Sequence, residues 1–275
     1  MEIKHFARKY LRENTLPTTF CPGCGLGIII NCFLKAVEQL GYEDLKKFIF
    51  CSGIGCAAWI PSPYFMADSI HTLHGRAVAV ALGVKMMRPE HHVVVFGGDG
   101  DIAGIGIGHL IHAARKNLEI ITIMVNNFTY AMTGGQVAPT TPLEIYTTTT
   151  PYGNYEPPLD VVEVVKAAGA SFVARWTTYH VMQLIKTFKT ALTKQGFSFI
   201  EVVSQCPTIY GRRLGFKSAF DMIKYFKENS IPVDKVGTTH SEQIKGKIVV
   251  GIFQDVSKPG YVSLYRKAVK KALGG

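Results

Sequence analysis

Short apolar runs alternate with amphipathic segments along most of the chain. Five runs have the length and composition of buried strands, at 47–52, 92–96, 120–125, 171–174 and 198–204. Apolar residues recur with helical spacing before and between these runs, at 25–40, 75–87, 104–116, 160–168 and 180–195. Strands and helices that alternate at this spacing predict an α/β fold, with a mostly parallel sheet and helices on both of its faces.

Two segments depart from this alternation. Residues 141–158, TPLEIYTTTTPYGNYEPP, have no helical period and are rich in Pro, Thr and Tyr, so we predict a long ordered loop there. After Cys206 the alternation weakens, which is typical of an extension rather than of a second sheet. We therefore expect a main α/β domain over residues 1–206 and a C-terminal extension over residues 207–275.

The positive charge is concentrated in that extension. The formal net charge of the chain is +10, and residues 207–275 contain 13 Lys and Arg against 5 Asp and Glu. No helix-turn-helix or RNA-binding pattern accompanies this charge, so no nucleic-acid partner is expected. Two interpretations remain, a solvated basic surface and the docking of an acidic protein or a neighbouring subunit.

The sequence also bears on localisation. No apolar run approaches the roughly 20 residues that are needed to cross a bilayer. The first residues, MEIKHFARKYLRENTLP, are charged and lack the apolar core of a signal peptide. We expect a cytoplasmic protein without membrane contact.

Polar side chains follow two neighbouring runs at the point where each predicted strand ends. HVVVF leads into GGDGD, which places Asp99 and Asp101 after the strand, and Asn127 follows the next one. Parallel strands bring such ends to one edge of the sheet, where α/β proteins bind ligands. A carboxylate, an amide and a backbone carbonyl suit Mg²⁺ that keeps phosphates in its shell, and Gly100 and Gly104 let backbone N–H groups approach a phosphate. A tight turn with a helix-capping aspartate is the alternative.

Six cysteines are spread over the sequence, at positions 21, 24, 32, 51, 56 and 206. Inside a cell, the Cys21–Cys24 pair indicates metal or redox chemistry, and a zinc knuckle, a thioredoxin-like pair and half of an iron–sulfur site all fit its spacing. Because no second C-x-x-C exists, four thiolates from distant loops favour a [4Fe–4S] cluster. Cys56 follows a turn and is better placed for a ligand than Cys51, which lies in a strand. Cys32 is interpreted as a helix core residue.

The G-D-G at 98–100 and the N-N at 126–127 together resemble the thiamine diphosphate-binding motif. The resemblance implies three ligands for Mg²⁺, namely Asp99, the Asn127 side chain and the Thr129 carbonyl. It also implies two residues that line the diphosphate, Gly100 and Asp101.

A longer set of motifs resembles the β subunits of the 2-oxoacid:ferredoxin oxidoreductases. The matching stretches are CPGCG, SGIGC, HTLHGRA, GGDGD, NNxxYAMTGGQxxPTTP and SQCPT, in family order. The resemblance implies the fold that binds the diphosphate half of thiamine diphosphate. It implies one [4Fe–4S] cluster beside the thiazolium ring, held by Cys21, Cys24, Cys56 and Cys206. It implies cofactor contacts from Ile54, Gly55, Cys56, Ala57, His74, Ala131 and Met132, with His74 as the catalytic candidate.

The activity that the resemblance implies is oxidative decarboxylation of a 2-oxoacid with coenzyme A to acyl-CoA and CO₂. Electrons would pass from thiamine diphosphate through the cluster to ferredoxin. MTGGQVAPTTP and GRRLGFKS favour the 2-oxoglutarate-type branch. Pyruvate or a branched-chain 2-oxoacid as substrate, and a non-redox thiamine diphosphate-dependent decarboxylase subunit, are the alternatives.

The sequence contains only half of a thiamine site. Thiamine activation needs a carboxylate at the aminopyrimidine, and the motifs above belong to the diphosphate-binding half. We therefore expect a partner chain, an α subunit or α plus γ, to supply the pyrimidine-binding half and much of the substrate contact. The isolated chain is expected to be inactive.

Overall fold

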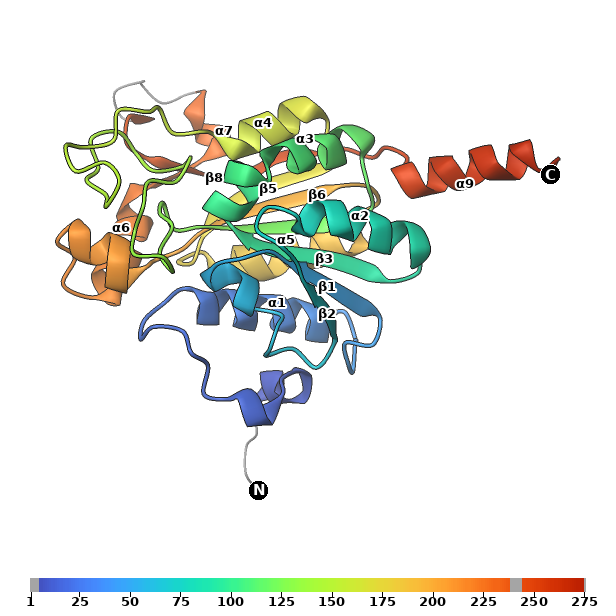
Figure 1. Cartoon of the computed structure of the whole chain (residues 1–275), viewed down its shortest axis with the longest axis horizontal. Helices are drawn as coiled ribbons and strands as arrows, with labels where there is room; N and C mark the ends of the chain where they lie inside the picture. The colour runs from blue at the N-terminus through green and yellow to red at the C-terminus, as the bar shows by residue number, and fades with distance from the viewer. Residues whose placement is uncertain (1–4, 238–243, 275) are drawn as a thin grey trace.

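An eight-stranded sheet runs through the centre of the molecule in the computed structural model, which describes residues 5–237 and 244–274 (Figure 1). Its strand order is β2-β1-β3-β4-β6-β5-β8-β7, and among the described strand pairs β5 and β8 alone are antiparallel. The strands are β1 Phe48–Ser52, β2 Asp68–His71, β3 His92–Gly98, β4 Ile121–Asn126, β5 Phe172–Thr177, β6 Ser198–Val203, β7 Ser230–Pro232 and β8 Ile248–Asp255. The mostly parallel sheet predicted from the sequence is confirmed.

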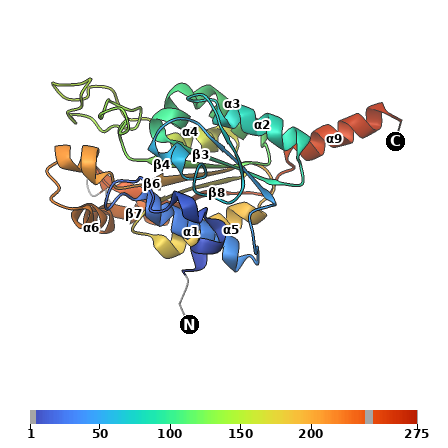
Figure 2. The same cartoon turned by 60° about the horizontal axis from the view of Figure 1, so that its bottom comes forward.

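Helices cover both faces of this sheet, as predicted (Figures 1 and 2). One face carries α1 Leu26–Gln39 and α5 Val181–Thr193, and the other carries α2 Ala77–Met87, α3 Ile107–Lys116 and α4 Val161–Ala168. The chain ends in α6 Ala219–Asn229, α7 Val233–Val236 and α9 Tyr261–Ala272, and α9 extends away from the rest of the molecule. Short helical turns are η1 Phe6–Tyr10, η2 Glu13–Thr15, η3 Cys56–Trp59, η4 Gly100–Ile105 and η5 Pro207–Gly211.

Strand β3 explains why its sequence is a continuous apolar run. Val93 and Val95 are buried in the core on the side of α2 and α3, whereas Val94 and Phe96 are buried on the side of α1 and α5. On that second side Phe96 makes an edge contact with the ring of Phe33 from α1. Both faces of the strand are therefore withdrawn from water, which removes the polar alternation of a half-exposed strand.

The structure differs from the sequence-based prediction in three strands and one helix start. Strands β2, β7 and β8 were not expected, and β8 brings the chain after Cys206 back to the central sheet beside β5. The helix predicted from residue 104 is split, since Gly104 takes non-helical angles within the wide turn η4, and α3 begins only at Ile107. Glycine permits this break because it has no Cβ.

The predicted loop over 141–158 is irregular and well anchored. The buried Asn154 donates from Nδ2 to the carbonyls of Thr141 at 2.8 Å and Glu156 at 2.9 Å. This side chain replaces the backbone pairing that the loop lacks. Within the described residues, no helix has the length and apolar character that a membrane span requires.

Candidate functional site

The loops after β1, β3, β4 and β6 enclose a cavity of about 540 Å³ at one edge of the sheet. These strands are parallel neighbours, so their carboxyl ends meet there, as expected for a ligand site in an α/β fold. Every residue that the sequence predicted to bind the metal, the cofactor or the cluster lines this cavity. The structure thus brings the predicted set together, while the role of each residue stays a prediction.

Asp99 follows β3 and is almost fully buried at the wall of the cavity. Burial raises the pKa of its carboxyl to about 7, against the hydrogen bonds that it accepts from the Thr140 hydroxyl and the Gly100 backbone N–H. The Thr140 Oγ1 lies 2.5 Å from Asp99 Oδ2. A nearby cation would reverse the effect of burial and favour the carboxylate, so this group fits a metal ligand.

Asn127 and Thr129 lie on the loop after β4, next to Asp99 because β3 and β4 are paired. The Asn127 Oδ1 accepts a hydrogen bond from the Thr129 backbone N–H at 3.3 Å, which folds the side chain over its own loop. Phe128 between them has a φ of 62°. That left-handed conformation is costly for a residue with a side chain, so the loop is held by its surroundings.

The predicted magnesium ligands form a mixed oxygen set. Over the described ranges, no three His, Cys, Asp or Glu side chains converge on one point. One carboxylate, one amide and one carbonyl remain at this edge of the cavity, and Mg²⁺ commonly takes few protein oxygens alongside substrate phosphates. The residues present therefore fit magnesium better than a metal that requires several charged or soft ligands.

Asp101 joins two loops of the cavity. Its Oδ1 accepts from the backbone N–H of Gly75 at 2.6 Å and of Ile54 at 3.3 Å, and it lies 2.7 Å from His74 Nδ1. A Cβ at Gly53 would lie 2.1 Å from Asp101 Oδ2, so glycine is required for this approach. Because Asp101 Oδ1 is an acceptor, the neutral His74 carries its proton on Nδ1 and Nε2 stays an acceptor.

Tyr130 makes the close approach at Gly100. A Cβ on Gly100 would lie 2.2 Å from the Tyr130 ring, and the Tyr130 hydroxyl donates to the Gly100 carbonyl at 3.0 Å. Glycine at this position thus lets the loop after β4 pack onto the turn after β3. The sequence predicts that Gly100 leaves room for a phosphate, and it carries no sign of the tyrosine at this position.

The four predicted cluster ligands line the same cavity. Burial, with a smaller contribution from the neighbouring cysteines, raises the pKa of the Cys24 thiol to about 12 and that of the Cys56 thiol to about 11. Cys206 is buried and Cys21 is exposed. Neighbouring thiolates repel one another, and bound iron would offset that repulsion; a cluster with one cysteine on each iron also spaces its ligands more widely than a single ion does.

The two remaining cysteines lie outside the cavity lining. Cys51 is buried within β1 and Cys32 is buried within α1. Burial raises the pKa of each thiol to about 12, which keeps both protonated and unreactive. Cys56 therefore lines the cavity and Cys51 does not, and the role of Cys56 as a cluster ligand stays a prediction.

Thr140 is a site residue that sequence reasoning missed. It lies far from Asp99 in the chain, and the Pro-Thr-Thr-Pro stretch that contains it gave no spacing to a strand end. The sequence offered only an indirect sign of Thr140, namely that the two small polar residues between prolines lie inside a stretch that matches the family motif. The Thr140 hydroxyl donates a hydrogen bond to one of the two carboxylate oxygens of Asp99.

Comparison with known proteins agrees with this geometry. Residues 53–202 match the family described as thiamine pyrophosphate enzyme, C-terminal TPP binding domain. The fold and the site thus define a thiamine diphosphate-binding chain. The chain is 51% identical over 267 residues to the 2-oxoglutarate synthase subunit KorB of Methanocaldococcus jannaschii, covering 97% of this chain and 98% of that protein.

Two further relatives support the same family. The KorB subunit of Archaeoglobus fulgidus is 42% identical over 254 residues, which cover 90% of this chain and 92% of that one. A solved 2-oxoglutarate:ferredoxin oxidoreductase from Magnetococcus marinus, with 2-oxoglutarate, coenzyme A and succinyl-CoA bound, matches at a TM-score of 0.86 and 34% identity, over 100% of this chain and 92% of that one. The chain belongs to the β subunits of the 2-oxoacid:ferredoxin oxidoreductases, and is therefore a subunit of an oxidoreductase.

Proposed function

We propose that this chain is the thiamine diphosphate- and [4Fe–4S]-carrying subunit of an enzyme that converts 2-oxoglutarate and coenzyme A to succinyl-CoA and CO₂, with ferredoxin as electron acceptor. The observation that carries the proposal is the shared cavity, in which an oxygen ligand set and four cysteines line the same space. The relatives named for 2-oxoglutarate support this substrate over other 2-oxoacids.

The residues of this chain would divide the work within the cavity. Asp99, Asn127 and the Thr129 carbonyl would hold Mg²⁺ against the diphosphate. Ile54 and Met132 line the cavity with apolar side chains that are 41% and 49% exposed, and so are available to pack against a ligand. Bound thiamine diphosphate would supply the nucleophilic carbon and the electron sink for decarboxylation.

His74 is the candidate for moving a proton. Its bond to Asp101 fixes the ring, and Nε2 is the atom left to accept or return a proton in the cavity. Cys21, Cys24, Cys56 and Cys206 would hold the cluster, which would supply an electron acceptor in the same cavity.

A partner chain would complete the site. The described residues lining the cavity include Asp99 and Asp101 as carboxylates, and both are engaged at the diphosphate side by Thr140, Gly75 and Ile54. The carboxylate that activates the aminopyrimidine is therefore expected from an α subunit, which would also cover the cavity and exclude water.

The test is purification of the complex without oxygen, followed by iron and sulfide analysis and assay with a panel of 2-oxoacids. We expect roughly four irons and four sulfides that depend on this chain, absorption at about 400 nm, and the highest kcat/KM with 2-oxoglutarate. Decarboxylation without iron or dye reduction would identify a non-redox lyase subunit instead. Preference for pyruvate or a branched-chain 2-oxoacid would overturn the substrate and leave the redox role in place.

A further inference from the structure

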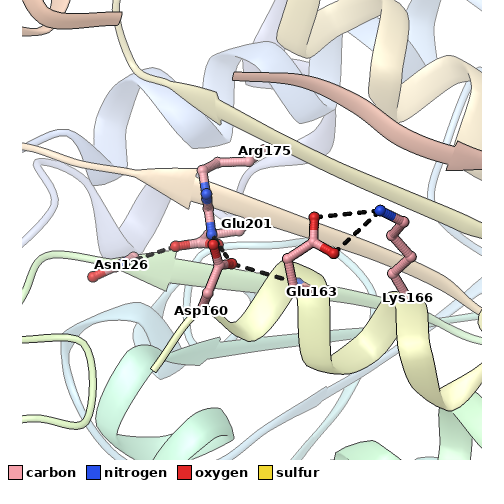
Figure 3. Close-up of polar contacts among 6 residues, drawn as sticks. All are labelled: Asn126, Asp160, Glu163, Lys166, Arg175 and Glu201. Atoms are coloured by element: carbon pink, nitrogen blue, oxygen red, sulfur yellow. Dashed lines mark hydrogen bonds and ion pairs between the residues drawn. The ribbon is translucent and has the colours of Figure 1, made fainter. Parts of the chain in front are cut away.

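A chain of buried polar side chains crosses three strands behind the loop that carries Asn127 and Thr129 (Figure 3). Arg175 on β5 donates from Nε to Glu201 Oε2 on β6 at 2.8 Å, and the two residues are direct cross-strand partners. Asn126, the last residue of β4, donates from Nδ2 to Glu201 Oε1 at 2.7 Å. The three side chains are almost fully buried.

Only one arrangement of donors and acceptors satisfies the hydrogen bonds that link Arg175, Glu201 and Asn126. The Arg175 guanidinium only donates, and the Glu201 carboxylate only accepts. The Asn126 amide must therefore turn its NH₂ group toward Glu201 and its oxygen away. That oxygen accepts a hydrogen bond from the Phe128 backbone N–H at 3.0 Å. The orientation of the Asn126 amide is thus set from β5 and β6, outside the loop.

Phe128 is the residue of the loop that needs such support. Its φ of 62° is rarely adopted by a residue with a side chain. Its N–H is held by Asn126, and its carbonyl accepts from the Thr141 hydroxyl at 2.7 Å. Loss of either bond would let the backbone relax toward an ordinary conformation, and would turn Asn127 and Thr129 on either side of it.

Stability alone is a weak explanation for this buried pair. Arg175 also donates from Nη2 to Asp160 Oδ1 at 2.5 Å, so the guanidinium is satisfied at both ends. A buried ion pair costs desolvation and often contributes no more to folding than apolar side chains of the same volume. We therefore expect the Arg175–Glu201 pair to matter mainly because it holds the Asn126 side chain in place.

We propose that Arg175 and Glu201 are positioning residues for the magnesium site, which they hold through Asn126 in the conformation that binds the metal. The inference rests on the proposed function, in which Asn127 and the Thr129 carbonyl are ligands. Residues that orient metal ligands typically change metal affinity by about 10- to 100-fold when they are replaced.

Glu201→Gln is the decisive variant, because it keeps the shape of the side chain but replaces one of the two acceptor oxygens with a donor. A glutamine has one acceptor and one NH₂ group at this end, so either Arg175 or Asn126 then faces a donor. Glu163→Gln is the matched control: it makes the same change at the exposed partner of Lys166, next to the network (Figure 3).

The experiment measures thiamine diphosphate bound to the complex of this chain and its partner subunit, by equilibrium dialysis against a series of Mg²⁺ concentrations. We expect Glu201→Gln to raise the Mg²⁺ midpoint by about 10- to 100-fold, with unchanged iron content and with retention restored at saturating Mg²⁺. Glu163→Gln should leave the midpoint within twofold of wild type. A merely structural role would lower retention at every Mg²⁺ concentration.

Two further variants keep the result interpretable. If Glu201→Gln does not fold, Asn126→Ala breaks the same link from the loop side and should shift the midpoint in the same direction. A folded variant of either kind with an unchanged midpoint would overturn the positioning role. An unchanged midpoint in Asp99→Ala would instead overturn the magnesium site itself, and with it this part of the proposed function.

Discussion

At the scale of single residues, two cysteines that are close in sequence lie in different surroundings. Cys56 begins the turn η3 and lines the cavity, whereas Cys51, five residues earlier, is enclosed within β1. Both thiols have raised pKa values because of burial, but the neighbouring cysteines add to the effect at Cys56. Thiols that crowd one another in this way are the ones expected to exchange their protons for iron.

We expect Cys56→Ser to lose the iron–sulfur cluster and Cys51→Ser to keep it. Serine preserves the size of each side chain and removes the thiolate that binds iron. Iron and sulfide analysis of both variants, purified without oxygen, measures the outcome. Loss of iron in Cys51→Ser with full iron in Cys56→Ser would reverse the assignment.

We expect Asp99→Ala to lose thiamine diphosphate and to retain the cluster. Removing the only carboxylate among the proposed magnesium ligands leaves the diphosphate charge poorly neutralised, at a cost on the order of several kcal/mol in a buried site. Cofactor content after gel filtration measures the effect. The exposed carboxylate of Asp68 is a matched control, and Asp68→Ala should retain the cofactor. Wild-type occupancy in Asp99→Ala would contradict the metal assignment.

The sequence could predict residues whose roles follow from a position at a strand end. Asp99 and Asn127 could be placed together because parallel strands share an edge. Thr140 and Tyr130 could not, because their contacts join Asp99 and Gly100 across a loop whose path no local pattern determines. The polar chain from Arg175 was equally hidden, since a charged residue inside a strand carries no sign of its partner.

At the scale of elements, the start of β3 carries a half-buried histidine whose surroundings favour its neutral form. The Tyr42 hydroxyl lies 2.7 Å from His92 Nε2, and the ring of Phe48 stacks on the imidazole. Burial, reinforced by the charges of Lys85 and Lys47, lowers the pKa of His92 to about 4. The packing of the strand start is therefore sensitive to acid.

We expect the chain to lose stability through His92 as the pH falls from about 6.5 to about 4. Above this window the imidazole is neutral in both states and its contribution is complete. Within it the unfolded chain binds a proton that the folded chain does not, at up to about 3 kcal/mol. The thermal midpoint of His92→Gln, which keeps an acceptor for Tyr42, should fall less steeply with pH. Parallel pH curves for the two proteins would contradict this.

The strands that the sequence could not predict lie toward the two ends of the sheet, β2 at one end and β8 with β7 at the other. Strand β2 is short and largely exposed, so it lacks the apolar run that identified the central strands. Strand β8 carries a register shift where it pairs with β5, which interrupts the alternation of its side chains. Central strands such as β3 and β4 were predictable because burial on both faces dictates their composition.

At the scale of the whole molecule, the cavity is flanked by surfaces that suit a covering chain. The loop over 141–158 exposes three tyrosines, with Tyr146 at 64%, Tyr152 at 96% and Tyr155 at 81%. Aromatic side chains of this kind are common at protein interfaces. Thr140, which donates to Asp99, immediately precedes this loop, and the buried Asn154 anchors it, so a partner bound there would cover the segment that supports Asp99.

We expect replacement of Tyr146, Tyr152 and Tyr155 by Ser to reduce copurification with the α subunit while leaving the fold and the cluster intact. Loss of three exposed rings removes contact area at the expected interface and little from the core. Pull-down of the tagged α subunit measures retention, with Tyr179→Ser as a control at an exposed tyrosine on another element. Full retention of the triple variant would place the interface elsewhere.

The most direct test of the proposed role is anaerobic turnover by the complex and by this chain alone. Addition of 2-oxoglutarate and coenzyme A to the complex should bleach the absorption at about 400 nm and reduce a viologen dye. Cys56→Ser should abolish the part of the bleaching that comes from the cluster of this chain. The isolated chain should neither bleach nor reduce the dye. Turnover of a 2-oxoacid by the isolated chain at the rate of the complex would contradict both the half-site and the need for a partner.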